Sequence, residues 1–346
     1  MAARYFLRSL NLLRSGRNYF YYDKIQTNFI NLQFIRLKQW RQPKSWSFNN
    51  KFKQNLIIAS SGLWGLFKFG DDEENDAESE LIMLIKRSVL LIQKDEFKKA
   101  EQMLHVALRQ AQMLQNEQGI TYIYYVMADL AFQVGEIEKA QNLYKSVMQR
   151  LLSSGTPQDD IKIVHISLKI ARLYEQDGNP SMAENGYQFC IQTMNTHLKD
   201  NPDDEETLIL WATLKDWYAK MLTTQSRYPE ALDNFLEAYK VCSQVNGKDH
   251  EWSLLLMNDL GMVLSVLGQH DDALKYLEEA VEIGKSVKDL DLTEMYINLG
   301  FVYLSKSLYK EAHKACMEGL KYAKENGKDD CLEEANQCLS AVKGLF

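Results

Sequence analysis

One pattern of apolar, small and charged positions recurs along the chain. The stretch NDLGMVLSVLGQHDDALKYLEEAV begins at Asn258, and INLGFVYLSKSLYKEAHKACMEGL begins 39 residues later at Ile297. Both run from Leu-Gly through a bulky residue and a turn to an alanine, a bulky residue and a small residue. Apolar residues at this spacing predict two helices joined by a short turn. A repeated pair of this kind predicts an array of similar units.

The alanine of the second helix aligns six such units. These anchor alanines are Ala100, Ala140, Ala183, Ala231, Ala273 and Ala312. The residue twelve positions before each anchor is small: Ser88, Ala128, Ala171, Ala219, Gly261 and Gly300. Small residues let two antiparallel helices cross closely, and a bulky residue one turn after the anchor fills the space between units. No unit can bury its apolar face alone, so we expect the units to stack.

This pattern resembles the tetratricopeptide repeat family, in which each unit is a helix–turn–helix. The resemblance implies an all-α fold, an α-solenoid of about six antiparallel helix pairs over residues 81–346. Successive anchors lie 39 to 48 residues apart, against 34 in that family, so we expect longer helices and loops. The last stretch, KDDCLEEANQCLSAVKGLF, is predicted to be a capping helix over the final apolar face.

The N-terminal part of the sequence has a different composition. Residues 1–70 contain 12 Lys and Arg residues and one acidic residue, whereas the rest of the chain has a net charge of -18. The start, MAARYFLRSLNLLRSGRNYF, is Arg-rich, acid-poor and amphipathic, which is typical of a mitochondrial transit peptide. We assign residues 1–55 to this segment; a basic tail or a surface helix is the alternative. The acidic body argues against a nucleic-acid partner.

Two short segments separate the basic part from the repeats. Residues 56–70, LIIASSGLWGLFKFG, are too short for a full membrane span, since about 14 apolar residues make roughly 21 Å of helix. They are interpreted as a possible membrane contact or as part of a cleaved presequence. Residues 71–80, DDEENDAESE, are expected to form a solvated acidic linker that places acids at the first turn of the next helix.

The sequence offers no candidate for catalysis. It contains none of the Gly-rich phosphate loops, zinc-binding His pairs or Ser nucleophile motifs, and the six histidines are scattered over different units. The five cysteines include no C-x-x-C pair, and an odd count does not suit a disulfide framework. We expect them to be reduced and buried, with a metal or redox role as the alternative. We therefore predict no enzyme, no cofactor and no metal site.

Stacked helix pairs offer an extended concave surface for partners, lined by the first helix of each unit. Tyr and Arg are favoured at such interfaces because they combine apolar area with hydrogen-bonding groups. Packing between units is the alternative role for the same residues. The candidate partner-binding residues are Tyr122, Tyr125, Asp129, Lys169, Arg172, Asp216, Lys220, Asn258, Met262, Asn298 and Phe301.

Further stretches resemble a mitochondrial branch of the repeat family. They are KDEFKKAEQMLHVALRQA, ITYIYYVMADLAFQVGEIEKAQNLYKSVMQRLL and AENGYQFCIQTM, and the resemblance extends over roughly residues 78–346. It implies a protein of the inner membrane on the matrix side, with respiratory complex III, including its Rieske subunit, as partner. It also implies a role in assembly or maintenance of complex III, through clearance of Rieske fragments.

Two other functions remain open at this point. One is a soluble cytosolic adaptor or cargo-binding module of the kinesin-light-chain type, whose repeats are also long. The other is a hydrolase of protein fragments, for which no nucleophile and base are visible. The position of the mature N-terminus separates the first alternative from the mitochondrial one.

Overall fold

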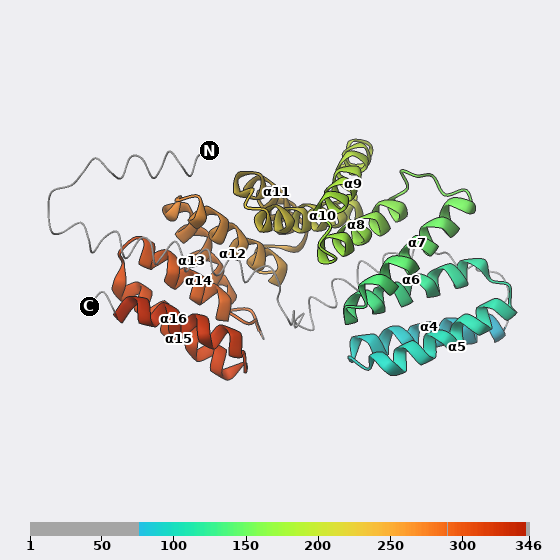
Figure 1. The fold of residues 1–346 in the computed structure, drawn as a ribbon, viewed down its shortest axis with the longest axis horizontal. Coiled ribbons are helices and arrows are strands. Elements are labelled where there is room, and N and C mark those ends of the chain that lie inside the picture. Colours follow the sequence, from blue (N-terminus) through green and yellow to red (C-terminus); the bar gives the residue numbers. More distant parts are fainter. Residues whose placement is uncertain (1–75, 289, 344–346) are drawn as a thin grey trace. The chain divides into compact units, whose positions relative to one another are not determined.

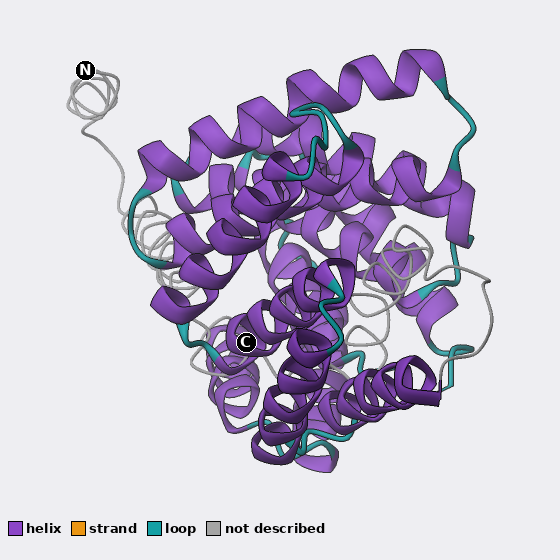
Figure 2. Ribbon diagram, turned by 90° about the vertical axis from the view of Figure 1, so that its right-hand side faces the viewer, coloured by secondary structure: helices purple, strands orange, loops and turns teal. Residues whose placement is uncertain are grey.

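The computed structural model describes residues 76–288 and 290–343, and this part is built from helices joined by short loops and turns (Figures 1 and 2). The all-α fold expected from the repeat pattern is confirmed there. The helices are α4 (Asp76–Gln93), α5 (Phe97–Met113), α6 (Glu117–Val134), α7 (Ile137–Ser153), α8 (Ile161–Gln176), α9 (Pro180–Asp200), α10 (Glu205–Thr224), α11 (Tyr228–Asn246), α12 (Glu251–Val266), α13 (His270–Gly284), α14 (Thr293–Ser305), α15 (Tyr309–Glu325) and α16 (Asp329–Lys343).

Twelve of these helices form six pairs, beginning with α4–α5 and ending with α14–α15, and each pair also contacts the next. The anchor alanines all lie on second helices, and the small residues twelve positions earlier all lie on first helices. All twelve of these residues are buried. α16 packs against α15 and α14, which is the position predicted for a capping helix.

The small residues lie where two helices of a pair cross closely. A Cβ atom at Gly261 of α12 would lie 2.5 Å from the Cγ of Leu277 on α13. One at Gly186 of α9 would lie 2.7 Å from the Cβ of Ala171 on α8. Distances below 3.0 Å are repulsive for carbon atoms, so no larger side chain fits without moving the helices.

Each turn inside a pair contains one residue with a left-handed backbone, five positions before the anchor alanine. These residues are Asp95, Gly135, Gly178, Ser226, Gly268 and Ser307, with φ from 59° to 80°. The backbone N–H of the following residue donates a hydrogen bond to a carbonyl of the first helix. Gln269, for example, donates to the carbonyl of Leu264 at 2.9 Å. This bond satisfies a carbonyl left free at the helix end, and it turns the chain into the second helix.

The start of the repeat domain differs slightly from the expectation. α4 begins at Asp76, so residues 76–80 of the predicted acidic linker are helical and belong to the first repeat unit. Acidic residues are favourable in the first turn of a helix, which accounts for the shift. The predicted transit peptide (1–55), the apolar segment (56–70) and residues 71–75 lie outside the described residues. Within the described ranges, no helix combines the length and apolar character that a membrane crossing requires.

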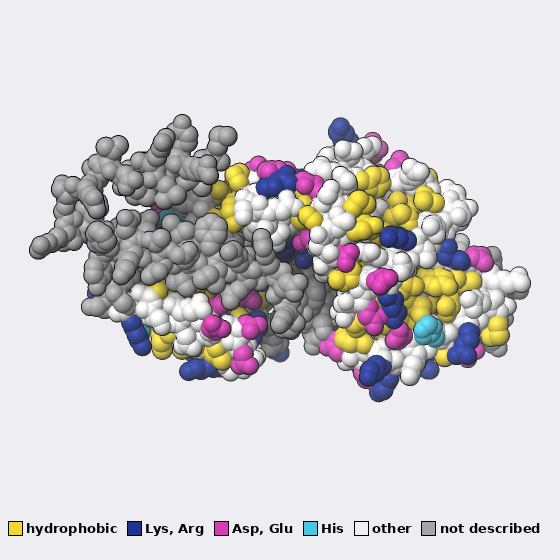
Figure 3. Space-filling view, viewed as in Figure 1, with side chains coloured by type: hydrophobic (Ala, Val, Ile, Leu, Met, Phe, Trp, Pro, Cys, Tyr) yellow, Lys and Arg dark blue, Asp and Glu magenta, His cyan; other side chains and the backbone are white. Residues whose placement is uncertain are grey.

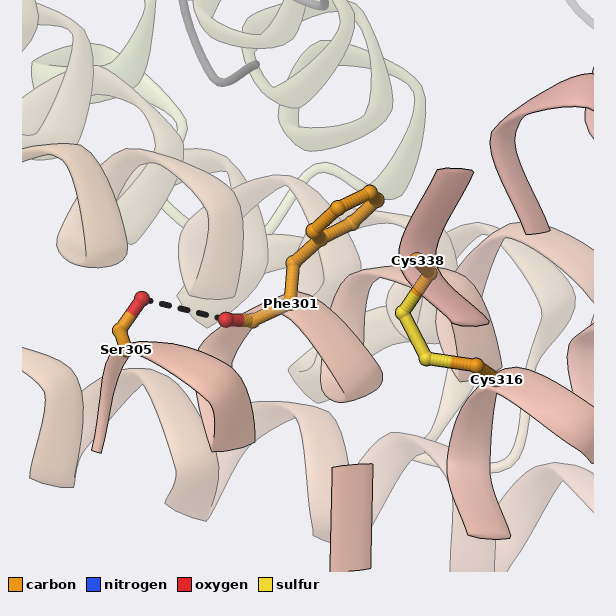
Figure 4. The surroundings of a disulfide bond; sticks show 4 residues. All are labelled: Phe301, Ser305, Cys316 and Cys338. Carbon is orange, nitrogen blue, oxygen red and sulfur yellow. Dashed lines mark hydrogen bonds between the residues drawn. A yellow bond between two sulfur atoms is a disulfide. The ribbon is translucent and has the colours of Figure 1, made fainter. Parts of the chain in front are cut away.

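The cysteines also differ from the expectation of five reduced thiols. Cys316 of α15 and Cys338 of α16 form a disulfide, with their Cα atoms 6.0 Å apart (Figure 4). The prediction is therefore wrong for these two, whereas Cys190, Cys242 and Cys331 are free and buried. The pairing depends on how α16 folds back on α15, which residue spacing does not reveal.

Candidate functional site

The eleven candidate partner-binding residues all lie on first helices, from α6 to α14. Seven of them are buried, four are half-buried and none is fully exposed. Most of the polar ones contact one another or a neighbouring unit. The alternative reading, packing between units, therefore accounts for much of the pattern. Contact of these residues with a partner stays a prediction.

The junction between α6 and α8 contains a buried ion pair. Lys169 of α8 donates to the carboxylate of Asp129 on α6 and to the hydroxyl of Tyr125, 2.8 Å away. Tyr144 of α7 also donates to Asp129. The side chain of Lys169 is 3% exposed and that of Asp129 is 21% exposed. The hydrogen bonds that Lys169 donates to Tyr125 and that Asp129 accepts from Tyr144 thus compensate much of the cost of burying this pair.

Burial dominates the titration of this junction. It lowers the pKa of Lys169, although Asp129 acts in the opposite direction. Burial, followed by the positive charge of Lys169, holds the pKa of His165 well below its ordinary value. Because the nearby lysine opposes a second positive charge, His165 is neutral at physiological pH. Its Nδ1 lies 3.4 Å from the Tyr125 hydroxyl.

The junction between α8 and α10 is built around Arg172. Its guanidinium donates to both carboxylate oxygens of Glu175, at 2.7 and 2.6 Å. Tyr187 of α9 donates to the same carboxylate at 3.0 Å. The guanidinium also lies 6.0 Å from the ring centroid of Trp217 on α10, at the limit of a cation–π contact. Arg172 therefore connects one helix pair to the next.

The junction between α10 and α12 places two carboxylates beside one lysine. The Nζ of Lys220 lies 2.8 Å from Asp216 and 3.6 Å from Asp259. The indole N–H of Trp252 donates to Asp216 at 3.3 Å. Trp252 is positioned by the start of α12. There the Nδ1 atom of His250 caps the helix by accepting a hydrogen bond from the backbone N–H of Trp252 at 3.2 Å.

Asp259 is the carboxylate that this arrangement leaves least stabilised. Burial raises its pKa to about 7, Lys220 opposes the shift, and the negative charges of Asp216 and Glu294 add to it. Lys220 itself has a raised pKa, because the neighbouring carboxylates outweigh its burial. The charge state of this junction therefore changes within the physiological pH range.

The junction between α12 and α14 contains a hydrogen bond between two amide side chains. Asn298 donates to the side-chain oxygen of Asn258 at 2.7 Å, and both residues are buried. Within the described residues, the side-chain oxygen of Asn298 has no hydrogen-bond partner. The two apolar candidates lie on the same helices, with Met262 half-buried and Phe301 buried. The Phe301 carbonyl accepts from Ser305 at 3.1 Å (Figure 4).

The junction members that sequence reasoning missed include Trp217, Trp252 and Asp259. Trp217 and Asp259 share a signal with Lys169 and Asn298, because each lies fourteen positions before its anchor alanine. In these four units, the residue at that position contacts the preceding unit. Trp252 has no such signal, since its contact depends on the cap that starts α12.

The second helices present a different surface. Isolated apolar side chains are exposed there, including Met113 at 78%, Met182 at 45% and Met317 at 46%. On the face shown in Figure 3, apolar, acidic and basic side chains are mixed over the described part of the chain. Single exposed apolar residues are normal on protein surfaces. Across residues 76–288 and 290–343, no cluster of His, Cys, Asp and Glu could hold a metal ion.

Family models match two parts of the chain. The tetratricopeptide repeat model matches residues 208–286, which cover α10 to α13. A model described as anaphase-promoting complex subunit 5 matches residues 292–344. Among solved structures, the apo form of RapI superposes with a TM-score of 0.59 at 18% identity, covering 92% of this chain and 81% of that one. At this identity the likeness shows the fold alone.

Curated relatives match most of the chain. The mitochondrial tetratricopeptide repeat protein 19 homolog of Drosophila melanogaster is 35% identical over 299 residues, which is 86% of this chain and 78% of the relative. The mitochondrial tetratricopeptide repeat protein 19 of Homo sapiens is 33% identical over 264 residues, 73% of this chain and 70% of the relative.

Proposed function

The chain belongs to the tetratricopeptide repeat protein 19 family, and from that premise we propose that it is a non-enzymatic scaffold supporting respiratory complex III. The observation that carries the proposal is 35% identity to a relative named mitochondrial, over 86% of this chain. We further propose that it lies on the matrix side of the inner membrane. There it would bind complex III, including the Rieske subunit, and help to clear Rieske fragments.

The junctions between units support a scaffold role. Buried or half-buried polar contacts link the first helices at four successive junctions, from the Lys169–Asp129 pair to the Asn258–Asn298 pair. Such contacts need defined geometry, so they fix the spacing between units. A surface that is ordered before binding loses less entropy when a partner docks. The array thus holds partner-facing groups of several units at set distances.

The first test asks whether the protein is associated with complex III in mitochondria. Mildly solubilised mitochondria are separated on a native gel and probed for this protein and for a complex III subunit. We expect co-migration, and in mitochondria that lack the protein we expect reduced complex III activity and accumulated Rieske fragments. A small free species together with normal complex III would contradict the proposal. Recovery in the cytosol with residues 1–55 intact would favour the cytosolic adaptor instead.

A second test compares the two surfaces of the array. Met262→Glu changes a half-buried residue of a first helix, and Met317→Glu changes a residue of a second helix that is 46% exposed. We expect Met262→Glu to weaken co-migration, since charge at an apolar contact must be desolvated. Met317→Glu should leave it unchanged. Both variants need a melting temperature near that of the parent; the opposite order of effects would place the partner on the second helices.

A further inference from the structure

The last repeat unit departs from the other five at one packing position. Four residues after the anchor alanine, the other units place a large buried side chain, such as Tyr144 or Phe235. The last unit has Cys316 there, which is also fully buried. A cysteine fills much less space than these side chains, so it needs a second group beside it to reach normal packing density.

That second group is Cys338 of α16. The two Cα atoms are 6.0 Å apart, within the usual range for a disulfide. Gly300 of α14 makes room for the pair, because a Cβ atom there would lie 2.6 Å from the Cys316 sulfur and 2.9 Å from the Cys338 sulfur. Figure 4 shows the bond joining α15 to α16. Three helices thus meet at one covalent link.

Apart from this link, α16 buries four further side chains, Cys331, Ala335, Leu339 and Val342. None of them is aromatic, and only Leu339 and Val342 are large aliphatic groups. At its start, Lys328 pairs with Asp291 at 2.5 Å, and Asn326 donates to the same carboxylate at 2.9 Å. The N-terminal end of α16 is therefore fixed by polar contacts, and its C-terminal half depends mainly on the disulfide and two aliphatic side chains.

We propose that the Cys316–Cys338 disulfide is a reversible redox latch, which holds the C-terminal half of α16 on α14 and α15 when oxidised and releases it when reduced. Its oxidant is a low-molecular-weight disulfide, and its reductant is the corresponding thiol, which reverses the same exchange. One thiolate attacks that disulfide, forms a mixed disulfide and expels a thiolate. The second cysteine thiolate then attacks the cysteine sulfur of the mixed disulfide and expels the remaining low-molecular-weight thiolate. The two cysteines lose two electrons and two protons, and the oxidant becomes two thiols.

The fold controls how quickly the latch reacts. Both sulfurs belong to fully buried residues, so an incoming thiolate reaches them only after α16 lifts. Burial raises the pKa of Cys190 and Cys331 to about 12 and that of Cys242 to about 11. Thiolates are the reactive form, so these three thiols react slowly while they stay buried.

Hydrogen exchange of the full chain, equilibrated in glutathione buffers of graded ratio, tests the latch. We expect the linked Cys316–Cys338 peptide in oxidising buffers. On reduction, the amides of residues 335–343 should exchange at least about tenfold faster, and those of α6 to α12 should not change. The amides at the start of α16 should change less. Equal exchange of α16 in both states, or five free thiols at every ratio, would overturn the proposal.

Cysteine variants supply the controls. Cys331→Ser lies on the same helix outside the disulfide, and it should keep the full redox dependence. The Cys316→Ser and Cys338→Ser double variant should show fast exchange of residues 335–343 in every buffer; if it fails to fold, the parent protein in excess reductant provides the same comparison. Dithiothreitol should reduce the disulfide of the native protein at least about 100-fold more slowly than the disulfide of protein unfolded in urea. Equal rates would show that opening of α16 does not control the bond.

Discussion

The α6–α8 junction and the α14–α16 region join helices by different chemistry. At α6–α8, a lysine, an aspartate and two tyrosines form a buried hydrogen-bonded group. At α14–α16, a glycine beside two bonded cysteines brings three helices together without a charge. The first arrangement depends on every partner being present, and the second depends on the absence of a side chain and on redox state. The two regions should therefore fail under different perturbations.

The largest effect is expected from breaking the charged junction. Lys169→Met leaves Asp129 without its cation, and we expect a loss of about 3 kcal/mol in the free energy of unfolding, measured with urea. Adding Asp129→Asn should recover most of the loss. Lys215→Met is the matched control, because Lys215 is also buried but pairs with the exposed Glu237; its cost should be roughly 1 kcal/mol or less. Equal losses for the two lysines would contradict the role given to the buried pair.

The next effect is expected at another close helix crossing that depends on a glycine, between α12 and α13. Gly261→Leu adds a side chain at a position where even a Cβ atom would lie only 2.5 Å from the Cγ of Leu277. We expect a loss of about 2 kcal/mol or more in a thermal or urea melt, because overpacking forces α12 and α13 apart. Gly261→Ala should cost less. An unchanged melt for Gly261→Leu would mean that the helices cross elsewhere.

A smaller effect is expected from pH at the α10–α12 junction. The pKa of Asp259 is about 7 in the folded state, above its ordinary 3.8, so folding favours the protonated form. This contribution to stability is complete below pH 4 and is lost as pH rises through 7. Asp259→Asn should be close to the parent in stability at pH 4 and more stable than the parent at pH 8. A constant difference across that range would rule out titration of Asp259.

The smallest effect is expected at the turns, which both regions share. Ser307 adopts φ 60° between α14 and α15, where Gly268 serves the equivalent turn between α12 and α13. Ser307→Gly should stabilise the protein by roughly 0.5–1 kcal/mol, since glycine adopts this conformation without steric cost. Gly268→Ser should destabilise it by a similar amount. Differential melting of the two variants checks both, and a loss for Ser307→Gly would show that its side chain contributes more than its backbone strain costs.

Much of the architecture follows from local pattern. The anchor alanines and the small residues twelve positions earlier predict which helices pair, and the structure buries all twelve. Acidic composition does not separate a solvated loop from the first turn of a helix, so it does not reveal that residues 76–80 are helical. The small residue twelve positions before each anchor also does not reveal the roles of Asp259 and Trp217, which lie fourteen positions before theirs.

The sequence by itself determined the number of helix pairs, their register and the family, because these depend on spacing along the chain. Only the tertiary structure decided which polar residues meet across neighbouring units. Lys169 and Asp129 are 40 residues apart, and Asn258 and Asn298 are also 40 apart. The pairing of Cys316 with Cys338 likewise depends on how α16 folds back. Contacts between units are set by helix packing angles and side-chain direction, which the periodicity of a single helix does not encode.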